Sequence, residues 1–168
     1  MTKSGHNQLN GEGNISLRPT TRADLDTLFV FQLDPEANYM AAFTARDMDK
    51  KEAYISKYGR LLDDPTIYNQ TILLEGQIVG SIAKFIMEGD AEITYWIDRQ
   101  YWGRGVATIA LQQFLLLETT RPLFARAAFD NTGSQRVLEK CGFIKIGEDK
   151  GFALERQGET VEYIFKLA

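Results

Sequence analysis

Apolar residues change their spacing along the chain, and each spacing predicts a different element. From position 21 to position 62 they recur every three or four residues, as on one face of a helix. Thr21 to Asp24 fits a capping box at a first helix start, and acidic residues near position 50 mark a second start. From 67 to 98 the residues are typical of strands, with a hairpin turn at Glu75-Gly76. Two helices followed by three strands are therefore expected.

The second half of the chain alternates strands with helices. A glycine-rich turn leads from the strand Glu92–Asp98 into a helix over Val106–Glu118. A further strand, a short helix over Asn131–Cys141 and two antiparallel strands complete the pattern. With a first strand over Ile15–Arg18, the expected order is β, α, α, β, β, β, α, β, α, β, β. This order predicts an α/β (α+β) domain with a mixed, mostly antiparallel sheet of about six to seven strands and about four helices.

Length and composition indicate how the chain is divided. Its 168 residues are enough for one domain with a sizeable core and too few for two ordinary ones. Residues 1–14 are rich in Gly, Asn and Ser, and we expect a flexible tail there. Residues 15–168 are expected to form the single domain. Hydrophobic residues make up 44% and charged residues 25%, which is typical of a soluble globular protein.

Charge and cysteine usage exclude several classes of partner. The net charge of −4 and the pI of about 5.1 argue against nucleic acid. No apolar run is long enough to span a membrane. The single cysteine, Cys141, cannot form an internal disulfide, which fits a cytoplasmic location. The only histidine, His6, lies in the polar N-terminal stretch, so no metal site is expected.

The turn between the third strand of the middle group and the next helix carries two glycines, Gly103 and Gly105. Glycines let the backbone approach a ligand closely and adopt positive φ. The free N–H groups of the helix start and its dipole favour a phosphate there, and Arg99 or Arg104 would add charge. A tight turn without a ligand explains the two glycines equally well. The dinucleotide fingerprint is not met, because Thr108 stands at its third glycine.

Two blocks resemble one family. Gln100, Gly103 and Gly105 meet the pattern [Q/R]-x-x-G-x-[G/A], and Asn131–Phe143 is similar to N-x-x-S-x-x-[V/L]-L-E-K-x-G-F. Together with the order of elements over residues 15–167, these blocks resemble the GNAT superfamily of N-acetyltransferases. The similar branch is the RimJ/RimL-like one, named for ribosomal-protein alanine N-acetyltransferases. The resemblance implies splayed central parallel strands and acetyl-CoA as the acyl donor.

The resemblance also implies how acetyl-CoA is held. Pantetheine is expected along the strand backbone at Trp96 and Ile97, one of which supplies the N–H that stabilises the thioester oxyanion. Asn131 is expected to contact pantetheine, while an N-cap is an alternative that is compatible with this role. The pyrophosphate is expected at the turn and the helix start. The remaining expected cofactor-binding residues are Gln100, Tyr101, Trp102, Gly103, Arg104, Gly105, Val106, Ala107, Thr108 and Ser134.

Catalytic groups are harder to assign, because Leu138 stands where many family members have a tyrosine acid. Ser134 occupies the position of a catalytic serine in the RimL-like branch, which implies that it acts as the acid. An ordinary serine early in a helix is the alternative. Glu92 is the candidate base, against the alternative of a solvated carboxylate at a strand end. We expect Cys141 to be a buried thiol rather than a nucleophile.

The implied reaction is direct acetyl transfer to a primary amine in a ternary complex. A protein N-terminal α-amine costs about 1 kcal/mol to deprotonate at pH 7, against about 4–5 kcal/mol for a lysine side chain. A small-molecule amine remains open, as do a non-catalytic acyl-CoA sensor and a phosphate-binding module unrelated to coenzyme A. Apolar alternation in the last strand would suit the edge of a homodimer. Residues expected either in the acceptor pocket or in the core are Tyr39, Met40, Phe43, Tyr68 and Tyr95.

Overall fold

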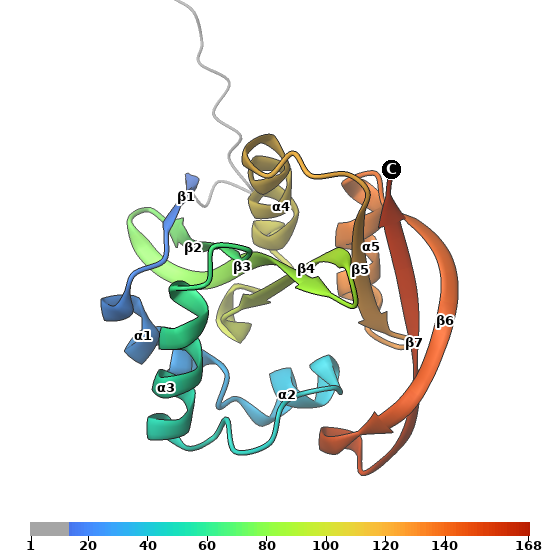
Figure 1. Ribbon diagram of the computed structural model, residues 1–168, viewed down its shortest axis with the longest axis horizontal. Helices are drawn as coiled ribbons and strands as arrows, with labels where there is room; N and C mark the ends of the chain where they lie inside the picture. The colour runs from blue at the N-terminus through green and yellow to red at the C-terminus, as the bar shows by residue number, and fades with distance from the viewer. Residues whose placement is uncertain (1–13) are drawn as a thin grey trace, which may run out of the picture.

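A computed structural model describes residues 14–168, which form one seven-stranded sheet with helices on both faces (Figure 1). The predicted tail lies outside the described residues except for Asn14. The strands are β1 (Ile15–Pro19), β2 (Tyr68–Leu74), β3 (Gln77–Met87), β4 (Asp90–Ile97), β5 (Leu123–Ala128), β6 (Ile144–Ala153) and β7 (Gly158–Leu167). Their order in the sheet is β1-β2-β3-β4-β5-β7-β6. The predicted fold class is confirmed.

Within the described residues there are five α-helices, one more than the sequence pattern predicts. They are α1 (Leu25–Phe31), α2 (Pro35–Ala41), α3 (Lys51–Leu62), α4 (Val106–Leu117) and α5 (Thr132–Lys140). The additional helix is α2, which begins with Asp34 as N-cap and Pro35 in its first turn. Both residues are favoured at helix starts. The helix is only seven residues long, so its apolar period is too short to stand out.

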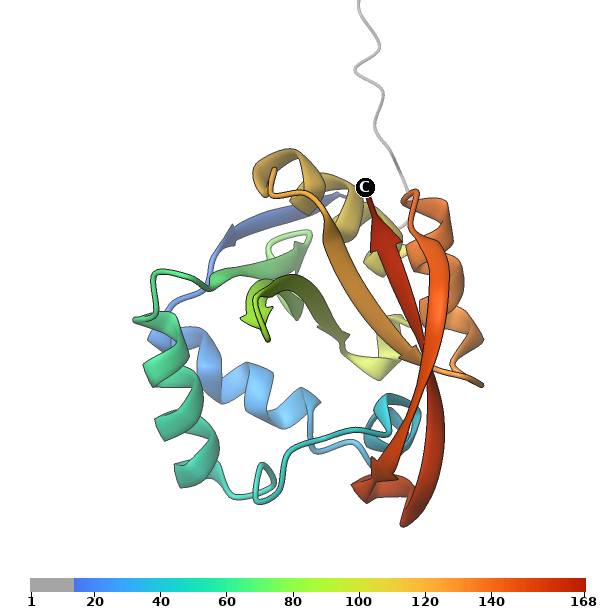
Figure 2. The ribbon, with the colours of Figure 1, turned by 45° about the vertical axis from the view of Figure 1, so that its right-hand side comes forward.

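Helices cover the two faces of the sheet unequally (Figures 1 and 2). On one face α4 and α5 pack on the main core, whose fully buried side chains include Leu111, Phe114 and Phe165. On the other face α1 and α3 form a smaller cluster around Phe29 and Tyr54. On this side a cavity lies between the sheet and the helices α1, α2 and α3, and the candidate site is there.

The segment that leads into α1 is fixed by an ion pair between Arg18 and the buried carboxylate of Asp24. The Thr21–Asp24 capping box is present, as predicted. Arg18 on β1 donates two hydrogen bonds to Asp24, at 2.7 and 2.8 Å, and Thr71 on β2 donates another. These bonds, with that of Arg18 first, lower the pKa of Asp24 to about 2 against the opposing effect of burial. The first strand, the second strand and the first helix are thus tied together at one carboxylate.

The central parallel strands β4 and β5 are paired at one position, Glu92 with Phe124. By contrast, β3 and β4 pair along the whole length of β4. Beyond Glu92 the two parallel strands diverge, as the resemblance implied. This divergence leaves one side of the β4 backbone without a neighbouring strand.

The last strand is not an edge of the sheet. β7 lies between β5 and β6, with antiparallel partners on both sides. Its apolar alternation therefore reflects burial within the sheet: Phe165 is 1% exposed. The reason for expecting a homodimer through this strand is lost. None of the helices within residues 14–168 has the length and apolar character needed to cross a membrane.

Candidate active site

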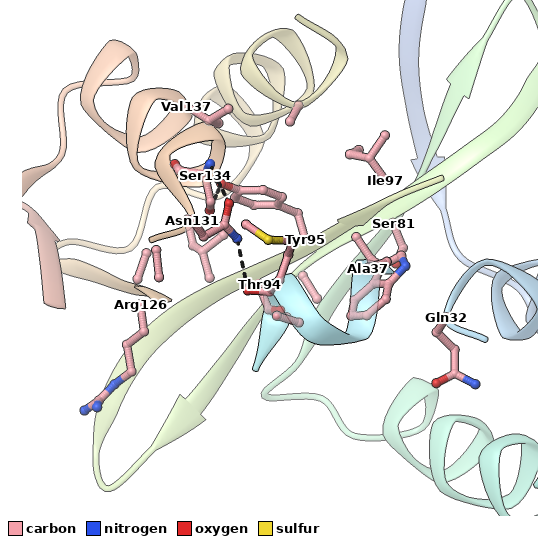
Figure 3. Close-up of a pocket in the computed structure, with 18 of the residues that line it drawn as sticks. Gln32, Ala37, Ser81, Thr94, Tyr95, Ile97, Arg126, Asn131, Ser134 and Val137 are labelled. Atoms are coloured by element: carbon pink, nitrogen blue, oxygen red, sulfur yellow. Dashed lines mark hydrogen bonds between the residues drawn. The ribbon is translucent and has the colours of Figure 1, made fainter. Parts of the chain in front are cut away.

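A cavity of about 1060 Å³ follows the gap between β4 and β5 and opens toward α1, α2 and α3. One end, called the turn end, is lined by Ile97, Gly103, Gly105 and the first residues of α4. The other end, called the carboxylate end, is lined by Glu92, Arg126 and Glu162. Figure 3 shows Ser134 and Tyr95 facing each other between them, with Arg126 and Gln32 on opposite sides of the view.

The register of β3 and β4 decides which backbone groups face the gap. Asp98 N–H donates to the Val79 carbonyl at 2.8 Å, so this amide points toward β3. Because strand amides alternate in direction, the Trp96 N–H also points toward β3, where Trp96 pairs with Ser81. The amides of Tyr95 and Ile97 point the other way, into the gap. The register therefore favours Ile97 over Trp96 as the oxyanion donor.

The glycine turn has the backbone geometry that the sequence predicts. Gly103 and Gly105 both have φ of +74°, a left-handed conformation that favours glycine. Gly105 is the N-cap of α4, and within the described residues no side chain caps that helix start. Its first N–H groups are therefore directed at the cavity with the positive end of the helix dipole.

Of the side chains around the turn, Trp102 lines the cavity, whereas Gln100 and Arg104 do not. Trp102 lines the cavity, and its indole N–H donates to the Ile97 carbonyl at 2.9 Å. Gln100 is exposed and donates to Asp98, and it is not among the described residues that line the cavity. Arg104 lies 5.5 Å from the Tyr101 ring, also outside the lining. Arg99 pairs with Asp34 and Glu36 of the α2 start, so its charge is already engaged.

The start of α5 brings Asn131 and Ser134 to the middle of the cavity. Asn131 is the N-cap, and its side-chain oxygen accepts from the Ser134 N–H at 3.2 Å. Its amide nitrogen donates to the Met40 carbonyl of α2. The Ser134 hydroxyl lies 2.6 Å from the Tyr95 hydroxyl. Burial raises the pKa of Tyr95 to about 12, against the lowering effect of this hydrogen bond.

Glu92 is buried at the carboxylate end, contrary to the solvated alternative. It is 5% exposed, and its side chain faces the cavity. Burial raises the pKa of Glu92, and Arg126, whose Nε lies 3.4 Å from the carboxylate, partly offsets that effect. A carboxyl group with a raised pKa is a better proton acceptor near neutral pH than an ordinary glutamate.

The expected pocket aromatics divide between the cavity and other contacts. Tyr95 and Phe43 line the cavity, as does Met40. Tyr68 packs against Phe114 of α4, on the main core. Tyr39 is half exposed and stacks under Arg156, outside the cavity lining.

Arg156 joins α2 to the segment before α5. Its guanidinium makes two hydrogen bonds to Asp130, at 2.8 and 2.9 Å, and a third to the Tyr39 carbonyl. Asp130 immediately precedes Asn131, so this clamp fixes the α5 start relative to α2. The side chain of Arg156 is 8% exposed, and its pairing explains how a guanidinium can be buried.

Cys141 is half-buried at the end of α5, with its sulfur 3.6 Å from the Thr108 carbonyl. Burial raises the pKa of its thiol to about 11. The thiolate is therefore scarce at neutral pH, which disfavours a nucleophilic role.

Several residues of the cavity escape the sequence patterns. Arg126 is a single charge within an otherwise apolar strand, Leu-Phe-Ala-Arg-Ala-Ala, and that contrast is the signal that could have found it. The others lie outside the two sequence blocks, except Arg136 and Lys140, which belong to the block Asn131–Phe143 but are given no site role by it. They are Gln32, Asn38, Thr94, Arg136, Lys140 and Glu162.

Comparison with known proteins identifies the class to which this fold and cavity belong. Residues 14–144 match the acetyltransferase (GNAT) domain family. The chain therefore belongs to the GNAT family, and it is an N-acetyltransferase. It is similar to the "Uncharacterized N-acetyltransferase p20" of Bacillus licheniformis, with 28% identity over 91% of this chain and 92% of that protein.

Solved structures share the fold. RimJ of Mycobacterium smegmatis in complex with CoA-disulfide is 21% identical, has a TM-score of 0.75 and is matched over 93% of this chain and 82% of that chain. The spermidine N-acetyltransferase of Vibrio cholerae in complex with CoA and spermine is 16% identical, has a TM-score of 0.74 and is matched over 90% of this chain and 94% of that chain.

Proposed function

We propose that the turn end binds acetyl-CoA, that the carboxylate end receives a primary amine, and that the acetyl group passes directly between them. The observation that carries this proposal is the single β4–β5 bridge. It leaves a gap with strand amides along one wall, the glycine turn at one end and the buried Glu92 at the other. An extended thioester and an amine could meet in such a gap with their reacting groups together.

The residues at the turn end fit acetyl-CoA. The left-handed glycines and the N–H groups between Tyr101 and Thr108 would hold the pyrophosphate at the start of α4. The free backbone of Tyr95 and Ile97 would pair with the pantetheine amides, beside Asn131. CoA is present in the RimJ and spermidine N-acetyltransferase structures that share the fold. Bound acetyl-CoA supplies a thioester carbonyl that an amine can attack.

Glu92 removes a proton from the acceptor amine, and Ile97 N–H stabilises the negative charge that develops on the thioester oxygen. The C–N bond forms and the C–S bond breaks. Ser134 donates a hydrogen bond to the departing sulfur, and Tyr95 supports that serine through their 2.6 Å contact. The proton taken up by Glu92 is released to solvent, and a solvent proton reaches the sulfur through Ser134, so the products are an N-acetyl amine and the CoA thiol.

The acceptor amine must be neutral to attack the thioester, so an amine that loses its proton easily near pH 7 is favoured. An α-amino group meets this condition better than a lysine side chain, because its pKa is about 8 rather than about 10.4. The carboxylates Glu92, Glu162 and Asp149 surround a single arginine, Arg126, so that end of the cavity is suited to a cationic acceptor.

A thiol-release assay tests the proposal. Acetyl-CoA is offered with three acceptors: a peptide with a free α-amine, the same peptide with a blocked α-amine and one lysine, and spermidine. We expect CoA release with the free α-amine and far less with the blocked peptide; release with spermidine alone would instead assign the acceptor to small polyamines. Acetyl-CoA binding without CoA release on any amine would contradict the proposal and favour the sensor alternative.

A pair of serine variants tests whether Ser134 takes part in the reaction. Ser134→Ala should lower the rate of CoA release about tenfold or more, the worth of one hydrogen bond to a group that becomes charged. Ser16→Ala removes an exposed serine on β1 and should leave the rate unchanged. Equal rates for the two variants would remove Ser134 from the proposed mechanism.

A further inference from the structure

Arg126 lies beside the proposed base in a long ion pair that does not have good hydrogen-bond geometry. The guanidinium is held from its far side: Nη1 donates to Glu162 of β7 at 2.8 Å and to Asp149 of β6 at 3.1 Å. Its Nε lies 3.4 Å from the Glu92 carboxylate of β4. Arg126 of β5, held by β6 and β7, thus places one positive charge next to Glu92 of β4.

The Nε–H of Arg126 is the unusual atom in this arrangement. It is buried, and within residues 14–168 it has no hydrogen-bond partner. A buried donor without a partner is costly to keep away from water, so such groups are rare in folded proteins. A carboxylate oxygen of Glu92 lies 3.4 Å from Nε, the distance of an ion pair rather than of a good hydrogen bond.

We propose that Arg126 is a positioning residue of the acyl transfer: its charge keeps the buried Glu92 ionised while leaving the carboxylate oxygens free to accept the proton of the amine. The inference rests on the proposed role of Glu92 as base. A strong hydrogen bond from Arg126 would also keep Glu92 ionised, but it would occupy the lone pairs that the amine needs. Because Glu162 and Asp149 hold the guanidinium, Arg126 can stabilise the charge of Glu92 without occupying the lone pairs of its carboxylate.

The charges around Glu92 make the role of Arg126 testable. Burial raises the pKa of Glu92, and Arg126 lowers it. Glu162 on β7 and Asp90 on β4 raise it by repulsion. Asp149 on β6 faces Arg126 instead and shares its charge. On β3, which pairs with β4 at this position, Lys84 donates to the Thr66 carbonyl. Arg126 is therefore the cation that opposes the burial of Glu92.

The experiment measures kcat/KM for the amine against pH, at saturating acetyl-CoA, in variants of the full chain. Arg126→Met removes the charge, and the limb of the profile assigned to Glu92 should move up by about one pH unit or more. Activity would then fall more at pH 6 than at pH 8.5. Arg126→Lys keeps a charge and should restore most of the profile. Because the amine is the same throughout, its own titration is common to all variants.

A second variant that should shift the pKa of Glu92 in the opposite direction separates this effect from a folding defect. Glu162→Gln removes a carboxylate that raises the pKa of Glu92 and competes for Arg126, so the limb should move to lower pH. A merely structural role for Arg126 predicts a different pattern. Both variants would then lower the melting temperature and reduce kcat by the same factor at every pH.

The outcomes are distinguishable. Opposite shifts of the limb in Arg126→Met and Glu162→Gln, both abolished when Glu92→Gln is added, support the proposal. An unmoved limb in Arg126→Met with retained turnover overturns it. Full activity of Glu92→Gln alone would overturn both this inference and the role of Glu92, while wild-type CoA release would still uphold acetyl transfer.

Discussion

The turn end of the cavity is made of backbone, whereas the carboxylate end is made of side chains that pair across the sheet. At the turn end, two left-handed glycines and the diverging β4 present N–H groups to the cavity. At the carboxylate end, Glu92 depends on Arg126, which in turn depends on Glu162 and Asp149. In the proposed function, the backbone of the first end would hold acetyl-CoA, and the side chains of the second end can be changed one residue at a time.

This difference has a functional meaning. Backbone amides bind phosphate and amide groups with little dependence on neighbouring side chains. Buried charges depend strongly on their partners, because the desolvation of an ion must be offset locally. We therefore expect substitutions at the carboxylate end to change kcat and the pH profile, and substitutions at the turn end to change the KM for acetyl-CoA.

Glu92→Gln should have the largest effect on kcat, and it should impair the carboxylate end without changing the turn end. The amide has nearly the same shape but cannot accept the proton of the amine, so kcat should fall by about 100-fold or more. The KM for acetyl-CoA should stay unchanged. Steady-state kinetics with both substrates measures the two constants, with the exposed Glu159→Gln on β7 as the matched control. A parallel rise in the KM for acetyl-CoA would show that the two ends are not independent.

Asp24→Asn tests the ion pair that holds α1 on the acceptor side of the sheet. The pKa of Asp24 is lowered to about 2, so its ionised form stabilises the fold above its unfolded pKa of about 3.9, and this contribution is lost as pH falls toward 2. At pH 7 the variant should lose on the order of 2 kcal/mol of unfolding free energy. In urea titrations the difference from wild type should shrink between pH 4 and pH 2.

The matched control for this variant is Asp63→Asn. It removes the exposed ion pair between Arg22 and Asp63, which should contribute little. A difference between Asp24→Asn and wild type that stays constant from pH 7 to pH 2 would contradict the role assigned to the ionised Asp24.

Gly103→Ala tests whether the backbone of the turn end binds acetyl-CoA, and Gly76→Ala is its matched control. Both glycines have positive φ, +74° and +77°, and a Cβ at either would meet nothing within 4 Å. Both variants should therefore lose about 1–2 kcal/mol of stability, the cost of a left-handed alanine. Only Gly103→Ala should also raise the KM for acetyl-CoA, by about tenfold if one phosphate contact is lost. Equal KM values in the two variants would mean that the turn does not bind the cofactor.

Tyr95→Phe should have the smallest effect. It removes the hydroxyl that contacts Ser134 at 2.6 Å and keeps the ring. The rate of CoA release should fall about fivefold, the worth of one hydrogen bond. Tyr68→Phe, on the core side of the sheet, should not change the rate. Loss of stability without loss of rate in Tyr95→Phe would assign that hydroxyl to packing alone.

The turn end could be predicted from the sequence because local residues determine it. Gly103 and Gly105 specify the backbone, and Asn131 and Ser134 lie three residues apart at a helix start. The choice between Trp96 and Ile97 could not be made from sequence, because it depends on the register of β3 against β4. That register was needed to show which amides face the gap.

At the carboxylate end, the sequence predicted Glu92 but not its partners, because the order of strands in the sheet brings those partners together. Glu92 stands out as an acid at a strand start. Its neighbour Arg126 lies 34 positions later, and Glu162 and Asp149 follow on two further strands. Tyr39 and Tyr68 were expected either in the pocket or in the core. Tyr68 lies against the core, where it packs on Phe114, whereas Tyr39 is half exposed and stacks on Arg156.

Intact-protein mass spectrometry tests direct transfer most directly. The protein is mixed with acetyl-CoA alone and then with acetyl-CoA and an accepted amine, and protein mass, CoA and acetylated amine are measured together. Direct transfer predicts an unmodified protein in both mixtures, with CoA and acetylated amine formed in equal amounts only when the amine is present. An acetylated protein that loses its acetyl group when the amine is added, with Cys141 as the first residue to examine, would contradict the account.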